Sequence, residues 1–102
     1  MNATGIGAKG TFSAAVGAPG GTIATTHAGS WVWGVGFDPA SATGPTVAAG
    51  QTLLNQLLGR KPASTSWVQS TTLPTPVSGT NVTINDTAPT AYPYVLAVAE
   101  IL

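Results

Sequence analysis

Large apolar side chains alternate with small or polar ones along several short segments of the chain, a pattern typical of β-strands. In residues 30–37 the large side chains stand at the odd positions: Trp31, Trp33, Val35 and Phe37. The even positions carry smaller side chains: Val32, Gly34 and Gly36. We expect the face with the large side chains to pack in the core, and the glycines to let another backbone approach the opposite face closely.

Eight such segments follow one another, separated by turns rich in proline and glycine. The expected strands span residues 6–15, 22–26, 30–37, 46–48, 52–58, 65–72, 81–85 and 93–101. Short strands that recur every 8 to 12 residues or so are typical of a β-sandwich or barrel. The pattern therefore predicts one all-β domain over residues 1–102, a jelly-roll-like β-sandwich of about eight short antiparallel strands.

The last of these segments is apolar on both faces. Its odd positions are Val95, Ala97 and Ala99, and its even positions include Leu96 and Val98. A strand of this kind belongs in the middle of a sheet, or at an edge that another chain covers.

Residues 51–58, with the sequence QTLLNQLL, are the best candidate for a helix. The four leucines have a helix-like spacing, but the segment would form only about two turns and lies between Gly50 and Gly59. A strand with a bulge is the alternative. Consistency with the rest of the chain favours the strand.

Charge narrows the range of partners. Charged residues make up only 6% of the chain, against about 25% in ordinary globular domains, and the net charge is zero. Three scattered cations, Lys9, Arg60 and Lys61, cannot neutralise a nucleic-acid backbone or hold an anionic membrane surface. Because no apolar run reaches the roughly 20 residues of a membrane span either, we expect no nucleic-acid partner and no membrane insertion. An uncharged surface instead permits close self-association.

The chain contains no cysteine, which excludes disulfides, thiolate metal ligands and a cysteine nucleophile. Many bacterial exported β-domains avoid cysteine, so we expect a secreted or cell-surface location. Residues 1–9 lack the basic start and apolar centre of a signal peptide. The expectation is therefore an exported chain whose signal has been removed, or a segment of a larger export product.

Five stretches carry a resemblance: residues 29–36 (GSWVWGVG), 50–53 (GQTL), 66–69 (SWVQ), 79–90 (GTNVTINDTAPT) and 98–101 (VAEI). Together they resemble the C-terminal half of an uncharacterised β-sandwich module of large bacterial exported proteins, often adjacent to immunoglobulin-like or fibronectin-like repeats. The resemblance implies no catalytic residues. It also implies an open sheet edge, which a partner chain, a homotypic contact or strand donation would cover.

Catalytic and metal-binding chemistry finds little support in the residues. A single histidine, His27, without cysteine cannot form a usual zinc site, and we expect it in a solvent-facing turn. No G-x-S-x-G segment is present, and only three acids, Asp38, Asp86 and Glu100, could form a carboxylate pair. The cluster at Asn85 to Thr87 could offer oxygens to calcium, but an Asx-turn at the end of a strand is the favoured interpretation. We therefore predict a protein that is not an enzyme, with no catalytic residue, metal or cofactor.

The aromatic residues offer one binding hypothesis. We expect Trp31, Trp33 and Trp67 to pack in the core or between sheets, although Trp33 could also be exposed. Tyr92 and Tyr94 flank Pro93 and are the better candidates for exposure. The candidate ligand-binding residues, which would stack on sugar rings, are Tyr92, Tyr94 and Trp33.

These observations favour a non-catalytic extracellular structural module that self-associates or packs with neighbouring chains. It would form a homo-oligomer or polymer, such as a surface layer, fibre or filament, including by strand pairing. The alternative is a carbohydrate-binding or adhesion module of a secreted bacterial protein.

Overall fold

The computed structural model of the chain describes residues 4–60 and 63–102. Eight strands follow one another: β1 (Ile6–Ala14), β2 (Gly20–Ala24), β3 (Trp31–Asp38), β4 (Thr46–Val47), β5 (Gln51–Arg60), β6 (Ala63–Thr71), β7 (Asn81–Ala88) and β8 (Tyr94–Ile101). All eight expected strands are confirmed. The described part of the chain contains no helix, and so none that could cross a membrane. Lys61 and Pro62, where the sequence predicts a turn, lie outside the described residues.

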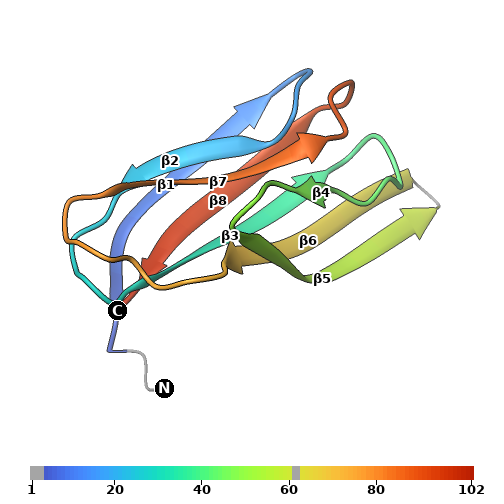
Figure 1. Cartoon of the computed structure of the whole chain (residues 1–102). Coiled ribbons are helices and arrows are strands. Elements are labelled where there is room, and N and C mark those ends of the chain that lie inside the picture. The colour runs from blue at the N-terminus through green and yellow to red at the C-terminus, as the bar shows by residue number, and fades with distance from the viewer. Residues whose placement is uncertain (1–3, 61–62) are drawn as a thin grey trace.

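The strands form two antiparallel sheets stacked as a sandwich (Figure 1). The larger sheet has the order β1-β8-β3-β6-β5, and the smaller has the order β2-β7-β4. Pairing of β1 with β8, β2 with β7 and β3 with β6 is the nested arrangement of a jelly roll. The fourth nested pair is missing, since β5 pairs with β6 in the larger sheet instead of with β4.

Strand β5 settles the choice between helix and strand for residues 51–58. It is a ten-residue strand, and its register with β6 shifts between Leu53 and Asn55, so that Leu54 is an extra residue. The interpretation as a strand with a bulge is therefore confirmed, and the helix is wrong.

The interior face of β3 is the opposite of the one expected. Val32, Gly34 and Gly36 are buried, whereas Trp33, Val35 and Phe37 are exposed. A Cβ on Gly34 would lie 2.6 Å from Cγ2 of Ile84, and a Cβ on Gly36 would overlap the ring of Trp67. Large side chains from β7 and β6 therefore occupy the space above these glycines and leave none for the large side chains of β3.

The apolar core lies between the sheets and is small. Its buried members are Ile23, Val32, Ile84, Leu96 and Val98, with Ala8, Phe12, Val82 and Tyr94 packed against them. Strand β8 contributes two of the buried residues and lies between β1 and β3, which confirms its expected place in the middle of a sheet.

The assignment of the two faces of β3 can be tested with a matched pair of substitutions. Gly36→Ala should lower the free energy of unfolding by about 1 to 3 kcal/mol, because the new methyl group forces the Trp67 ring to move. Phe37→Ala on the exposed side of β3 should change it by less than about 1 kcal/mol. Urea unfolding followed by tryptophan fluorescence measures the free energy of unfolding of both variants. A larger loss for Phe37→Ala than for Gly36→Ala would show that the side of β3 with the large side chains faces the core.

Candidate functional site

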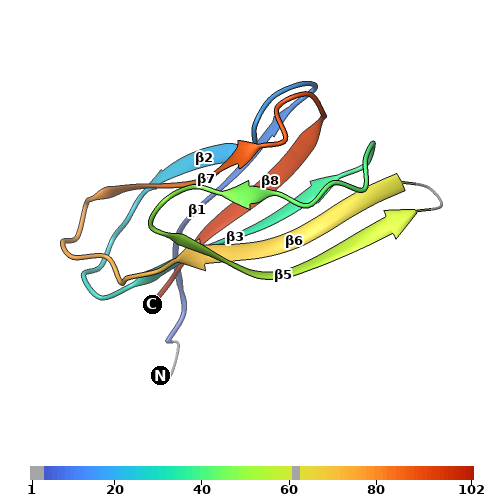
Figure 2. The same cartoon turned by 45° about the vertical axis from the view of Figure 1, so that its right-hand side comes forward.

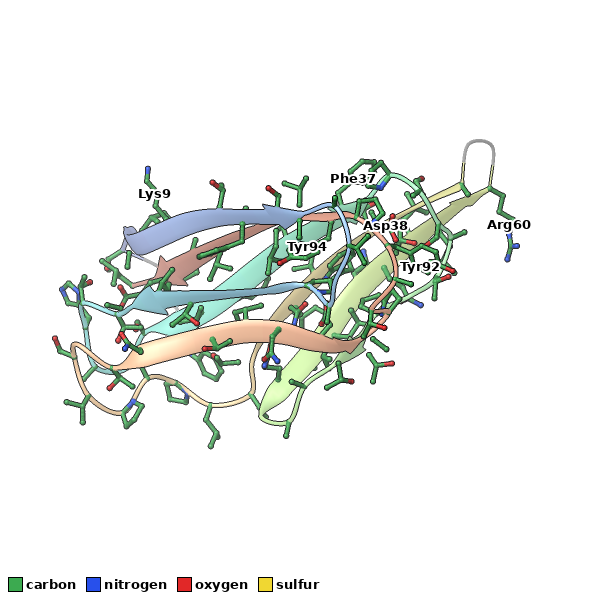
Figure 3. All side chains as sticks on the ribbon, turned by 90° about the horizontal axis from the view of Figure 1, so that it is seen from above. Lys9, Phe37, Asp38, Arg60, Tyr92 and Tyr94 are labelled. Atoms are coloured by element: carbon green, nitrogen blue, oxygen red, sulfur yellow. The ribbon has the colours of Figure 1, made fainter. Side chains whose placement is uncertain are left out.

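The outer face of the larger sheet presents a ridge of large apolar side chains. We call the exposed surface formed by residues of β1, β8, β3, β6 and β5 on this side the outer face. Its ridge consists of Trp33, Val35 and Phe37, which are 41%, 54% and 45% exposed. In Figure 3, Phe37 and Lys9 project from this side, away from the smaller sheet.

The strand register places small or apolar side chains on both sides of the ridge. Val35 has Ala97 of β8 on one side and Val68 of β6 on the other, and Phe37 lies between Val95 and Ser66. One row further out, Leu57 of β5 is opposite Ser66 and 71% exposed. The outer face is therefore apolar over β8 and β3, and on β6 and β5 the apolar Val68 and Leu57 alternate with Asn55 and Ser66.

Two shallow hollows flank the ridge. The first, of about 150 Å³, lies over β5 and β6 and is lined by Val35, Asn55, Gln56, Leu57, Ser66, Trp67 and Val68. The second, of about 440 Å³, lies over β1 and β8 and is lined by Lys9, Gly10, Thr11, Ala97, Val98 and Ala99. Lys9 is the one charged side chain along these rows of described residues, and it stands at a corner.

The three candidate stacking residues do not form one platform. Trp33 belongs to the outer face, whereas Tyr94 pairs with Ala14 and packs against the core between the sheets. Tyr92 lies in the loop before β8 and is 37% exposed. The expectation of exposure is therefore wrong for Tyr94, which lies on the same side of β8 as Leu96 and Val98. Burial in the core is confirmed for Trp67 alone, since Trp31 is half-buried and Trp33 exposed.

All three acids of the chain are buried, and Glu100 is the most strongly bound. Its carboxylate is fully buried at the end of β8 and accepts hydrogen bonds from β1 and from the loop between β2 and β3. The donors are Ser30 Oγ at 2.7 Å, Thr26 Oγ1 at 2.9 Å, and the backbone N–H groups of Ala8, Thr26 and His27 at 2.9–3.1 Å. Burial opposes ionisation, but the bonds from Ser30, Ala8 and Thr26 outweigh it and lower the pKa of Glu100 to about 2.

Asp38 and Asp86 occupy contrasting environments. Asp38 ends β3 and accepts hydrogen bonds from Ala40 N and from Ser41 N and Oγ, so it shapes the turn that follows. Asp86 is only 2% exposed, and neither of its carboxyl oxygens has a hydrogen-bond partner among the described residues. Burial raises the pKa of Asp86 to about 7, and the nearby Gln69 side chain offsets only part of this rise. The Asx-turn expected at Asp86 is wrong, because β7 continues through it to Ala88.

A network of amides next to Asp86 ties the two sheets together. Gln69 of β6 accepts from Trp67 Nε1 at 2.8 Å and donates to Gln51 Oε1 at 2.8 Å. Gln51 in turn accepts from Asn85 N at 2.9 Å and donates to Asn85 Oδ1 at 2.9 Å. This partly buried polar network holds β5 and β6 against β7. No local pattern in the sequence predicts this network, because its three amides come from three separate strands.

The surroundings of His27 bring few groups together that catalysis or metal binding could use. His27 is exposed in its turn, as expected, and its Nδ1 lies 2.8 Å from Thr26 Oγ1, which donates to Glu100. No hydroxyl group of the described residues forms a hydrogen bond with the other ring nitrogen. The described residues also contain no group of three or more His, Cys, Asp and Glu side chains that could hold a metal ion.

No protein-family model, no curated protein and no solved structure matches this chain. The resemblance to a module of exported proteins therefore stays a prediction. The class of protein rests on the fold: an all-β, cysteine-free sandwich with a jelly-roll strand order and an apolar outer face.

The two shifted carboxyls predict that stability is greatest in mildly acidic solution. The native state keeps the proton of Asp86 between about pH 4 and 7, where the unfolded chain has released it, so stability falls as pH rises through this window. Glu100 acts in the opposite sense. Its stabilisation is present above its unfolded pKa of 4.5 and is lost as pH falls towards about 2. We expect the free energy of unfolding, measured by urea titration, to be largest at about pH 4 to 5.

Asp86→Asn separates the two contributions. A pKa raised from 3.8 to about 7 corresponds to about 4 kcal/mol, which screening by nearby solvent reduces. The uncharged variant should therefore be more stable than the native protein by about 1 to 3 kcal/mol at pH 8 and differ little from it at pH 4. A native unfolding free energy that stays constant or rises between pH 5 and 8 would contradict this assignment.

Proposed function

We propose that the chain is a non-catalytic structural module of a secreted or cell-surface assembly, and that copies of it associate through the outer face. The observation that carries the proposal is the exposed apolar ridge of Trp33, Val35 and Phe37. Exposed single apolar residues are ordinary on protein surfaces, but a group of large exposed apolar side chains on neighbouring strands is typical of an interaction site.

The shape of the outer face favours a second copy as the occupant. Its ridge along β3 and the hollow over β8 and β1 lie side by side, so the ridge of each of two copies can enter the hollow of the other. Such a contact uses the same patch on both molecules, as a two-fold interface requires. Lys9 is the one charged side chain beside the ridge among the described residues of the outer face. Few charged groups therefore lose water when two outer faces come into contact.

The area of the outer face indicates the strength of the contact. Strands lie about 4.8 Å apart and rise about 3.3 Å per residue, so five strands over the seven paired positions of β3 and β8 cover roughly 550 Å². Two such faces bury about 1,100 Å² in total, near the lower limit for specific interfaces. We therefore expect a weak contact on its own, which depends on protein concentration.

A charge placed on the ridge should abolish this contact. Val35→Lys puts an ammonium group in the middle of the apolar ridge, and its desolvation should weaken association by at least about tenfold. Val77→Lys is the matched control, because Val77 is 63% exposed and lies in the loop between β6 and β7. Sedimentation velocity of the two variants and the native protein over a range of concentrations measures the effect. A native protein that stays monomeric at millimolar concentration would refute the proposal.

Carbohydrate binding is the second candidate, and the exposure of Trp33 and Phe37 along one strand favours it. Aromatic rings on a flat sheet face can stack on sugar rings. If this is the function, Trp33→Ala should abolish retention on an insoluble polysaccharide, whereas Tyr92→Ala should leave it unchanged, since Tyr92 lies in the loop before β8 and is not part of the ridge on β3. The measurement is a pull-down on a panel of insoluble polysaccharides. Retention on none of them would remove this candidate.

A further inference from the structure

Strand β5 is an open edge of the larger sheet. It pairs with β6 on one side and is last in the strand order, and Figures 1 and 2 show no strand beyond it. Before Arg60 it contains no charged residue and no proline, the features by which edge strands usually avoid pairing. Residues 54–57 are all exposed. At the opposite edge, β1 carries Lys9 and an irregular register after Ile6.

The sequence of β5 reads almost the same in both directions. Its centre is Leu53-Leu54-Asn55-Gln56-Leu57-Leu58, two leucines, two amides and two leucines. Two antiparallel copies can therefore place leucine beside leucine, and Gln56 of one copy beside Gln56 of the other. Cross-strand pairs of this kind stabilise a sheet, whereas like charges opposite each other would destabilise it.

The bulge makes this symmetry compatible with the faces of the sheet. In a regular strand Leu53 and Leu58 would point to opposite faces, since they are separated by an odd number of positions. The extra residue Leu54 resets the alternation, and the residues opposite Leu53 and Leu58 in β6, Gln69 and Thr65, are both buried between the sheets. Both leucines therefore lie on the same side of the strand.

In one register between the two copies of β5, the two residues of each pair lie on the same face of the sheet. It places Leu53 opposite Leu58 of the second copy and the bulge residues opposite its Leu57. Gln56 then meets its own counterpart on the two-fold axis. Paired residues share a face at each of these positions, as an antiparallel sheet requires. At the strand ends Arg60 faces the uncharged Gln51, so the two arginines lie far apart.

We propose that β5 pairs with β5 of a second copy, antiparallel and about a two-fold axis at Gln56, so that the two larger sheets become one ten-stranded sheet. This inference rests on the proposed function as an assembly module but uses a different surface. Two different two-fold contacts on one chain, the outer face and the β5 edge, can join copies into an open row. The strand pairing adds main-chain hydrogen bonds to the small area of the outer face.

A cysteine at the axis tests the pairing directly, because the chain has no other cysteine. Residues directly opposite in an antiparallel pair have Cβ atoms about 4.5–5.5 Å apart, close enough for a disulfide after a small shift. Gln56→Cys should form disulfide dimers under mild oxidation at least about tenfold faster than Thr22→Cys, an exposed position on the smaller sheet. Equal rates for the two variants on non-reducing gels would overturn the proposal.

Charge pairing supplies a second, reversible test. Gln56→Lys and Gln56→Glu should each lose the edge contact, since like charges meet at the axis, and an equimolar mixture should regain it. Sedimentation velocity in the Val35→Lys background isolates the edge from the outer face. Recovery in the mixture there supports the edge pairing even if the outer face proves inert. Association of the native chain without recovery overturns the edge pairing alone, and a native chain that never associates overturns both proposals.

Discussion

The space above Gly34 and Gly36, filled by Ile84 of the smaller sheet and by Trp67 of the neighbouring strand β6, is the constraint on which the rest of the structure depends. Because these positions carry no side chain, Ile84 and Trp67 reach over β3 and fill the interior. Trp67 in turn donates to Gln69, which begins the amide network to β7. The same geometry leaves the large side chains of β3 no place except the solvent side. The burial of Ile84 and Trp67 in the interior and the exposure of the apolar ridge therefore both follow from the missing side chains at Gly34 and Gly36.

The sequence was sufficient to predict where the strands lie, but not which side of β3 is buried. Alternation and turn residues are local signals, so all eight strands and even the bulge in β5 could be predicted. Which side of β3 is buried depends on the size of the side chains that β6 and β7 place above it. Residues 31–38 alone do not contain this information. The orientation of Tyr94 was accessible, because it shares its parity with Leu96 and Val98. The extension of β7 through Asp86 was not, since Asn85 to Thr87 is also a favourable turn sequence.

The placement of the acids separates the formal charge of the chain from the charge of its surface. All three carboxylates are inside, where Glu100 organises the loop before β3 and Asp38 shapes the turn after it. Lys9 and Arg60 remain exposed. A net charge of zero therefore describes a molecule whose exposed charged side chains in the described ranges are all basic. Most of the surface of the described residues therefore presents uncharged hydroxyl, amide and apolar groups.

The scarcity of surface charge also determines how an assembly of such modules would respond to its surroundings. Contacts between uncharged faces are hardly altered by ionic screening, because there is little Coulomb attraction to screen. Their strength comes mainly from the release of water from apolar groups, which weakens on cooling. Layers or fibres held together through the Trp33 ridge would therefore tolerate both fresh and saline water, and would loosen in the cold.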